Sequence, residues 1–133
     1  MPYPSVKEFK EILFSSPLEE IVREHLFDGE PYVFRTSAKA HTLLKQHVSQ
    51  RLNTVEDDIR IVGSARIGFS LSPDSFGRQF SAESDIDVIV INEQLFDLIW
   101  MTLLRWHYPR RNQPLGPDTD WARYRRHDVF WGG

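Results

Sequence analysis

The chain has 133 residues, which is enough for one domain with a core of its own but not for two. It contains no cysteine, which excludes disulfide bonds, thiolate metal sites and sulfur-based redox catalysis. The net charge of −3 provides no general attraction to nucleic acid. No apolar run approaches the roughly 18 residues that a membrane span requires. We therefore expect a cytoplasmic protein that does not enter a membrane.

The amino-terminal part of the sequence predicts helices. Apolar residues between Val6 and Leu13 recur at helical spacing, and Ser5 is suited to cap this helix. A second helix is expected to have Pro17 at its first position and to end at Asp28-Gly29. The stretch PYVF, residues 31–34, is expected to be extended. A third helix is predicted from residue 36 or 37 to about residue 53.

Two short strands are predicted in the second half of the chain. Residues 59–63 read as a strand that ends at a glycine, and residues 70–84 read as a long loop rich in Ser, Gly and Pro. Residues 86–91 form a short strand that is apolar except for Asp87, which is typical of a buried central strand. The third segment of interest, residues 93–108, predicts a helix that is hydrophobic on most of its surface and therefore well buried.

The remaining sequence predicts a proline-containing connector, a helix over residues 118–127 and a strand that begins at Asp128. Six of the sixteen basic residues lie between Arg105 and Arg126, where a solvated face is the ordinary interpretation and a phosphate-facing patch is the alternative. Together the elements predict an α+β fold, with a small mixed β-sheet flanked by helices. We expect one domain, residues 1–133, with a helical part over about 1–53 and a core over about 54–133.

Two aspartates at the start of the apolar strand require an explanation. In an extended strand, alternate side chains point the same way, so Asp85 and Asp87 should be neighbours. Two adjacent carboxylates repel each other unless one is protonated or a cation lies between them. A hard cation, Mg²⁺ or Mn²⁺, suits a set of oxygen ligands. The simpler alternative is that both aspartates face solvent at the end of a strand.

The Gly63-Ser64 pair makes the first interpretation more specific. A strand that ends in Gly-Ser and turns into a helix offers backbone N–H groups and a hydroxyl to a phosphate. The combined pattern, VGSARIGFS followed by SDIDVIVI, resembles the nucleotidyltransferase superfamily, whose members share the fold of DNA polymerase β. The resemblance covers about residues 36–91, and it implies a polymerase β-like fold.

The resemblance also implies roles for individual residues. Asp85 and Asp87 would hold Mg²⁺ on the phosphates of a nucleoside triphosphate (NTP) and act in catalysis. The nucleotide itself would be bound by Gly63, Ser64, Arg66 and Ser84. A third carboxylate is expected in the family, and Asp128 is the candidate in this chain.

Two departures from the family pattern leave the function open. The spacer between Ser64 and Asp85 is longer than usual, and Arg78 within it either reaches a phosphate or is solvated. The third carboxylate is Asp128, lies outside this sequence or does not exist. The leading hypothesis is a Mg²⁺-dependent transfer of a nucleotide onto a hydroxyl of a protein, nucleotide or RNA. The alternative is a catalytically incomplete domain that binds nucleotide, RNA or a partner protein, as antitoxin or defence-system members do.

Overall fold

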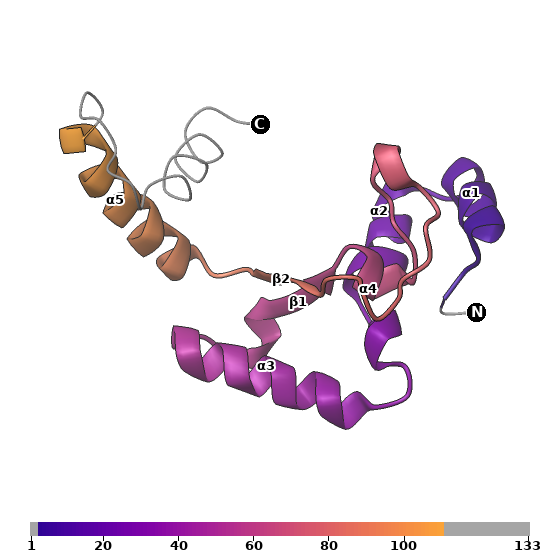
Figure 1. Cartoon of the computed structure of the whole chain (residues 1–133), viewed down its shortest axis with the longest axis horizontal. Coiled ribbons are helices and arrows are strands. Elements are labelled where there is room, and N and C mark those ends of the chain that lie inside the picture. The colour runs from indigo at the N-terminus through magenta and orange to yellow at the C-terminus, as the bar shows by residue number, and fades with distance from the viewer. Residues whose placement is uncertain (1–2, 111–133) are drawn as a thin grey trace. The chain divides into compact units, whose positions relative to one another are not determined.

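A computed structural model describes residues 3–110 of the chain, which divides into two units, Met1–Asn92 and Glu93–Gly133 (Figure 1). The first unit contains the α-helices α1 (Val6–Ser15), α2 (Leu18–Ile21), α3 (Ala38–Leu52) and α4 (Ser64–Ile67) and the strands β1 (Ile59–Val62) and β2 (Asp87–Val90). It also contains the π-helix η1 (Val22–Phe27) and the 3₁₀-helices η2 (Tyr32–Phe34), η3 (Glu56–Asp58) and η4 (Pro73–Ser75). The described part of the second unit is one helix, α5 (Glu93–Arg110).

The expected α+β class is confirmed. Both motif strands belong to one sheet, in which β1 pairs with β2 in antiparallel orientation and Val62 lies opposite Asp87. A small mixed sheet was expected, and the sheet formed by residues 3–110 instead has two strands that are antiparallel. The additional strand predicted to start at Asp128 lies outside the described residues.

The predicted amino-terminal cap is confirmed. The Ser5 hydroxyl accepts a hydrogen bond from the Glu8 N–H at 3.3 Å, and the Ser5 N–H donates to the Glu8 carboxylate at 2.7 Å. This reciprocal pair is a capping box, which satisfies two donors at the start of α1. The hydrogen bonds from Ser5 lower the pKa of Glu8, because they favour its charged form.

The segment between the first and third helices differs from the prediction. Pro17 is the N-cap of α2 instead of its first residue, and α2 continues directly into the π-helix η1. Residues 31–34 were expected to be extended, which is wrong for all but Pro31, because Tyr32–Phe34 form the 3₁₀-helix η2 and Pro31 is its N-cap. The Phe34 N–H donates to the Pro31 carbonyl at 2.9 Å. This turn brings the Tyr32 ring against the Phe80 ring, with a centroid distance of 6.3 Å.

The third helix is confirmed close to its predicted bounds. The Ser37 hydroxyl caps α3 by accepting from the Ala40 N–H at 3.3 Å. The helix ends at Asn53, which has φ 52° and ψ 47° and is the non-glycine residue with positive φ in the described chain. Asparagine tolerates this left-handed conformation, so a sharp end to α3 costs little here.

The core of the first unit joins both halves of its sequence. Phe9 and Ile21 from the amino-terminal helices pack with Ile67 and Phe69, and all four are almost completely buried. The rings of Phe9 and Phe69 meet edge to face, with a centroid distance of 5.7 Å. Such pairs are favoured by the ring quadrupoles in addition to the area that they bury. This cluster holds the segment after α4 against the amino-terminal helices.

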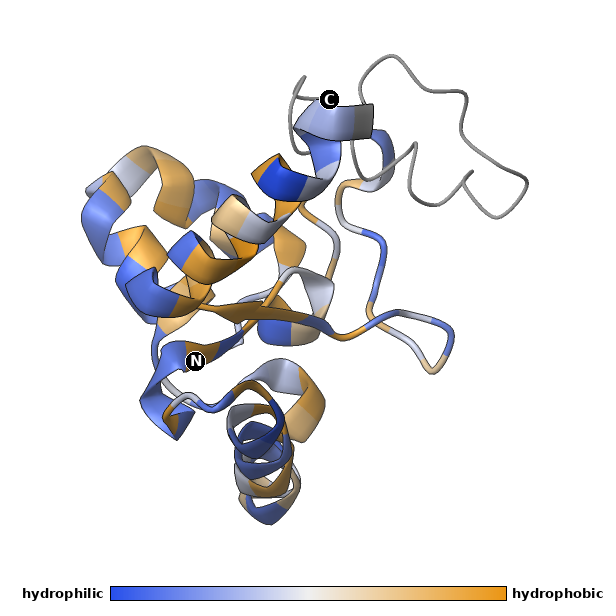
Figure 2. Ribbon diagram, turned by 90° about the vertical axis from the view of Figure 1, so that its left-hand side faces the viewer, coloured by the Kyte–Doolittle hydropathy of each residue, from blue (hydrophilic) through white to orange (hydrophobic). Residues whose placement is uncertain are grey.

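The prediction that β2 is a buried central strand is wrong. Ile59 and Ile61 of β1 are 1% and 2% exposed, but Val88 and Ile89 of β2 are 36% and 37% exposed. The reason is tertiary, because β1 contacts α3, α4 and η1, whereas β2 contacts mainly β1. Figure 2 shows hydrophobic residues along the paired strands, so hydropathy alone does not distinguish the covered strand from the uncovered one.

Helix α5 is confirmed as a helix but not as a well buried one. Apolar side chains are exposed along it, with Phe96 at 64%, Leu98 at 65% and Met101 at 46%. The Phe96 and Trp100 rings stack on each other, with centroids 6.2 Å apart. Within residues 3–110, no helix combines the length and the hydropathy that crossing a membrane requires.

The Phe9–Phe69 contact should dominate the stability of the first unit. Phe69→Ala should lower the free energy of unfolding by about 3–5 kcal/mol, because it removes a buried aromatic side chain and leaves a cavity. All four tryptophans lie at or beyond position 100, so the loss should be measured by far-UV circular dichroism during urea unfolding, not by fluorescence. Phe14→Ala is the matched control, because Phe14 is 93% exposed and should change stability little.

Candidate functional site

The site begins at the turn between β1 and α4. Gly63 follows the last residue of β1 and has φ 68° and ψ −153°, a conformation that is essentially restricted to glycine. Ser64 then starts α4, as the sequence predicted. Gly68 ends this short helix with φ 100°, and its N–H donates to the Ser64 carbonyl at 2.8 Å. Two glycines therefore set the entry to and the exit from α4.

The turn at Gly63 lies directly against the side chain of Asp87. A Cβ atom built on Gly63 would be 2.7 Å from Oδ2 of Asp87, which is closer than real Cβ contacts. This approach follows from the register, since Val62 is the partner of Asp87 in the sheet and Gly63 comes next. Glycine is thus required at position 63 both for the backbone conformation and for the space that the carboxylate occupies.

A cavity of about 600 Å³ opens at this point. Its walls come from the Gly63-Ser64 turn, from the loop that follows Phe69 and from the segment that leads into β2. The lining residues are Gly63, Ser64, Ser70, Leu71, Ser72, Ser75, Arg78, Gln79, Ser81, Glu83, Ser84, Asp85 and Asp87. The structure therefore brings together five of the predicted site residues, namely Gly63, Ser64, Ser84, Asp85 and Asp87.

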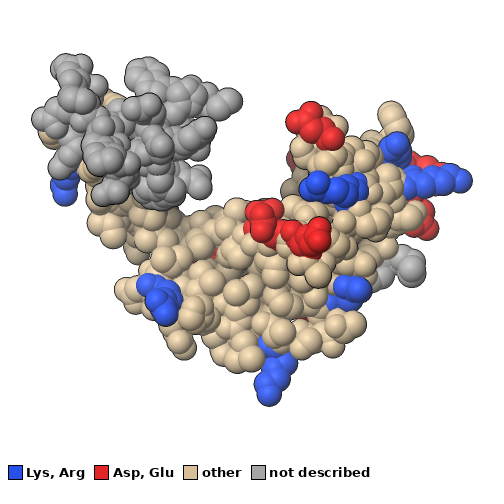
Figure 3. All heavy atoms as spheres, in the orientation of Figure 1, with Lys and Arg blue, Asp and Glu red and all other residues tan. Residues whose placement is uncertain are grey.

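The two aspartates are accessible in this cavity. Both are exposed, and within the described part of the chain neither accepts a hydrogen bond or lies within ion-pair distance of a cation. Their oxygen atoms fit the preference of Mg²⁺ or Mn²⁺ for hard ligands. Figure 3 shows that acidic and basic side chains are neighbours on the surface of the first unit. The site is therefore a local concentration of acids and not part of a surface of one charge.

The long loop forms an ordered wall of the cavity. Phe69 and Gln79 form an antiparallel bridge, and the Ser70 N–H donates to the Arg78 carbonyl at 2.8 Å. The hydroxyls of Ser70 and Ser75 are 2.7 Å apart. This hairpin-like arrangement brings the exposed Arg78 side chain to the cavity. The positive charge of Arg78 is opposite in sign to the charge of the acids there. Arg78 is thus solvated, as one interpretation had it, and lines the cavity, while its contact with a phosphate stays a prediction.

Ser84 has a structural task at the edge of the cavity. Its hydroxyl accepts from the Ser81 N–H at 3.0 Å, and its own N–H donates to the Ser81 carbonyl at the same distance. The Ser81 hydroxyl in turn accepts from the Glu83 N–H at 3.3 Å. This turn fixes the chain just before Asp85, so Ser84 orients the approach to the aspartates as well as lining the cavity.

Arg66 does not lie in this cavity, in contrast to its expected part in nucleotide binding. It is 4% exposed, and its guanidinium donates to the Glu30 carbonyl at 2.7 Å and to the Glu24 carbonyl at 3.4 Å. Residues two apart on a helix point in different directions, so Ser64 and Arg66 cannot serve the same cavity from α4. Arg66 instead connects α4 to η1 and to the segment that follows η1.

The third carboxylate remains a prediction for Asp128, which lies outside the described residues. Glu83 is a third acid at the cavity, although it was not predicted. Within residues 3–110, no three His, Asp or Glu side chains lie close enough together to share a metal ion. The described chain therefore provides a pair of possible metal ligands.

Sequence reasoning missed the serines of the cavity wall. Ser70 and Ser75 line the site from a segment whose composition indicated only a loop. The available signal was Phe69, an aromatic residue next to Gly68 at the start of the loop. Its burial in the core anchors the loop, and an apolar anchor of this kind favours an ordered loop over a solvated one.

Comparison with known proteins identifies no relative of this chain. No protein-family model matches the chain, and no significant similarity is found to a curated protein or to a solved structure.

The close approach of Gly63 and Asp87 predicts an energetic coupling. Gly63→Ala should lower the free energy of unfolding by about 1–3 kcal/mol from backbone strain alone. In an Asp87→Ala background the loss should be smaller, with a coupling of at least about 0.5 kcal/mol, because the clash with the carboxylate is gone. Urea unfolding of the four proteins, followed by circular dichroism, measures this coupling.

Gly77→Ala provides the control for that experiment. Gly77 also has positive φ, at 84°, but a Cβ there would meet only the two methyl groups of Val6, at 3.4 and 3.5 Å. Its effect should add to that of Asp87→Ala without coupling. If Gly63→Ala and Gly77→Ala lowered the free energy of unfolding equally, and each effect simply added to that of Asp87→Ala, the contact between Gly63 and Asp87 would be contradicted.

Proposed function

We propose that the chain is a Mg²⁺-dependent nucleotidyltransferase that moves a nucleoside monophosphate from an NTP onto a hydroxyl group. The observation that supports this most is the meeting of two distant motifs, because Gly63-Ser64 and Asp85/Asp87 line one cavity. The resemblance noted in the sequence rests on these same residues in the same order. The cavity volume of about 600 Å³ also lies within the usual range for small-molecule sites.

Each part of the cavity has a task in this reaction. The Asp85 and Asp87 carboxylates would hold Mg²⁺, which when bound neutralises charge on the phosphates and orients them. Gly63 lets the backbone approach a phosphate closely, and the Ser64 hydroxyl can donate to a phosphate oxygen. Arg78 supplies a cation from the loop wall, which opposes the charge of the triphosphate. The chain thereby positions the NTP, which is most of what phosphoryl transfer requires from a protein.

A second function is favoured by one specific observation. The carboxylates that line the cavity within residues 3–110 do not form a group of three around one point. Two carboxylates suffice to bind a metal–nucleotide complex, but activation of the attacking hydroxyl needs a further metal or a base. The second candidate is therefore a domain that binds nucleotide, RNA or a partner protein without transfer. In the nucleotidyltransferase reaction proposed above, the group that accepts the nucleotide is a hydroxyl of a protein, a nucleotide or an RNA.

Binding should be visible as a change in thermal stability. Mg²⁺ or Mn²⁺ together with a non-hydrolysable NTP should raise the melting temperature, since a ligand at 100 times its Kd stabilises the native state by about 2.7 kcal/mol. The double variant Asp85→Asn, Asp87→Asn should lose this shift and keep the fold of the unliganded protein. Differential scanning calorimetry with and without metal measures both effects.

A charge-matched control separates the site from a general effect of acid removal. Asp74 and Asp97 are also exposed but do not line the cavity. Asp74→Asn with Asp97→Asn should retain the full metal-dependent shift. A shift that survives in the Asp85, Asp87 variant would locate the metal elsewhere and overturn the proposed site.

Asp128 distinguishes the enzyme from the binding domain. If Asp128 is the third carboxylate, Asp128→Asn should leave nucleotide binding nearly intact and reduce transfer by orders of magnitude, as expected for an interaction made mainly in the transition state. Transfer of label from an α-³²P-labelled NTP to an acceptor measures the reaction. Binding without transfer by the unaltered chain would support the second function. Full activity of Asp128→Asn would exclude Asp128 from the reaction.

A further inference from the structure

A second cavity lies on the side of β1 where Arg66 is found. Its volume is about 180 Å³, and it is enclosed by α3, β1 and the segment after η1. The lining residues are Phe27, Asp28, Gly29, Pro31, His41, Lys45, Asp57, Ile59, Arg60, Ile61 and Arg66. It shares no residue with the cavity that contains Asp85 and Asp87. All of its walls belong to the first unit.

The guanidinium of Arg66 is incompletely satisfied at this cavity. It is 4% exposed and donates to two backbone carbonyls, those of Glu30 and Glu24, while its Nε atom has no hydrogen-bond partner. Burial lowers the pKa of Arg66, and nearby acids oppose that shift. A buried polar group without a partner costs free energy, and the cost is larger when the group is charged. The Arg66 guanidinium therefore lacks one hydrogen-bond acceptor.

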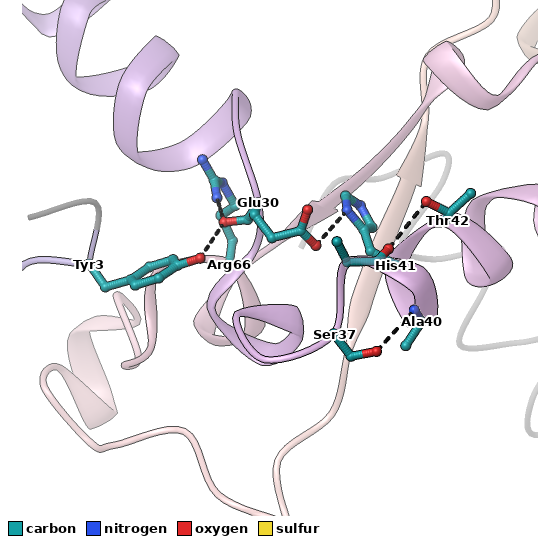
Figure 4. A network of polar contacts seen from close by, with 8 residues as sticks. Tyr3, Glu30, Ser37, Ala40, His41, Thr42 and Arg66 are labelled. Atoms are coloured by element: carbon teal, nitrogen blue, oxygen red, sulfur yellow. Dashed lines mark hydrogen bonds and ion pairs between the residues drawn. The ribbon is translucent and has the colours of Figure 1, made fainter.

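The neighbouring carboxylates do not form an ion pair with Arg66. Within residues 3–110, no carboxylate lies within 4.0 Å of the Arg66 guanidinium. Figure 4 shows why Glu30 does not, since its carbonyl accepts from Arg66 while its carboxylate points to His41. The distance from Glu30 Oε1 to His41 Nδ1 is 2.9 Å. Asp28 lines the cavity but forms no ion pair with Arg66.

Further cations face the same small space. Lys45 is half-buried on α3 and forms no ion pair within the described chain, and Arg60 donates to the carbonyls of Asp57 and Ile59. Three basic side chains, Lys45, Arg60 and Arg66, thus line the cavity together with two carboxylates, Asp28 and Asp57. With the Glu30–His41 pair set aside, the lining has an excess of positive charge.

We propose that this second cavity binds a small oxyanion, with a phosphate or carboxylate group as the ligand chemistry. Oxygen atoms of such a group would accept from the Lys45 ammonium and from the Arg66 guanidinium, since both residues line the cavity. Hydrogen bonds between these charged groups and an oxyanion are stronger than neutral ones. The volume accommodates a small group, whereas the first cavity is more than three times larger.

Titration with sodium phosphate at constant ionic strength, with chloride as the balancing ion, tests this proposal. Phosphate should raise the melting temperature in a saturable way, by about 5 °C at ten times its Kd. Backbone amide signals of Gly29, Lys45 and Arg66 should shift in the NMR spectrum with the same Kd. Parallel titration with sodium acetate tells a phosphate site from a carboxylate site, and a saturable response to either supports the proposal.

Variants of α3 make the test specific. Lys45→Gln should weaken the Kd about tenfold, as expected for the loss of one charge-assisted hydrogen bond. Lys39→Gln is the matched control, because Lys39 is exposed on the same helix and does not line the cavity. Arg66→Gln is less informative alone, since it also removes the bonds to Glu24 and Glu30.

Two outcomes would overturn the proposal. One is the absence of a saturable response to both phosphate and acetate beyond that to chloride. The other is an equal response of the Lys45→Gln and Lys39→Gln variants. The Asp85→Asn, Asp87→Asn variant should keep the response in full, so failure of the nucleotide site and failure of this site are distinguishable.

Discussion

The register between β1 and β2 is the constraint on which the candidate site depends. Because Val62 pairs with Asp87, the glycine that follows β1 lies beside the aspartate that begins β2. A slip of one residue would move Asp87 to the other face of the sheet and would separate it from Gly63. The 2.7 Å separation between a Cβ at position 63 and Asp87 Oδ2 expresses the same constraint in atomic terms. The two motifs form one site only because this pairing holds.

Helix α4 divides the first unit into two environments of different charge. Its first residue, Ser64, lines the larger cavity, while Arg66 lines the smaller one. The larger cavity contains three carboxylates, Glu83, Asp85 and Asp87, and one arginine, which favours a cation or a cation–nucleotide complex. The smaller cavity has the reverse excess, which favours an anion. A four-residue helix can separate these environments because its successive side chains diverge around the axis.

The loop that completes the larger cavity depends on the core for its order. Phe69 is buried against Phe9, and its bridge to Gln79 folds the loop back on itself. Gly68 permits this return, and its carbonyl accepts from the Phe80 N–H at 2.9 Å. The amino-terminal helices therefore support the cavity wall, in part through the contact between Phe9 and Phe69. Removal of that contact would affect the cavity wall as well as the stability of the unit.

Local features of this protein could be predicted from its sequence. The capping box at Ser5, the helix after Ser37, the strand that ends at Gly63 and the helix that starts at Ser64 all follow from short-range chemistry. Hydrogen bonds within one turn and the special backbone of glycine involve neighbours in the chain, so they are legible in the sequence. The resemblance of the two motifs to the nucleotidyltransferase pattern likewise implied that Gly63-Ser64 and Asp85/Asp87 belong together.

Burial and side-chain direction were decided by the tertiary structure. The apolar run of β2 and the apolar helix α5 were both expected to be buried, yet the side chains of Val88, Ile89 and Phe96 are exposed. Hydropathy states what a side chain prefers, but only the packing of other elements determines whether it is covered. Arg66 shows the same limit, because its place in the motif suggested phosphate binding and the helical geometry turned it toward Glu30. The sequence by itself determined the local elements and the chemistry available, and long-range packing decided which side chains share a cavity.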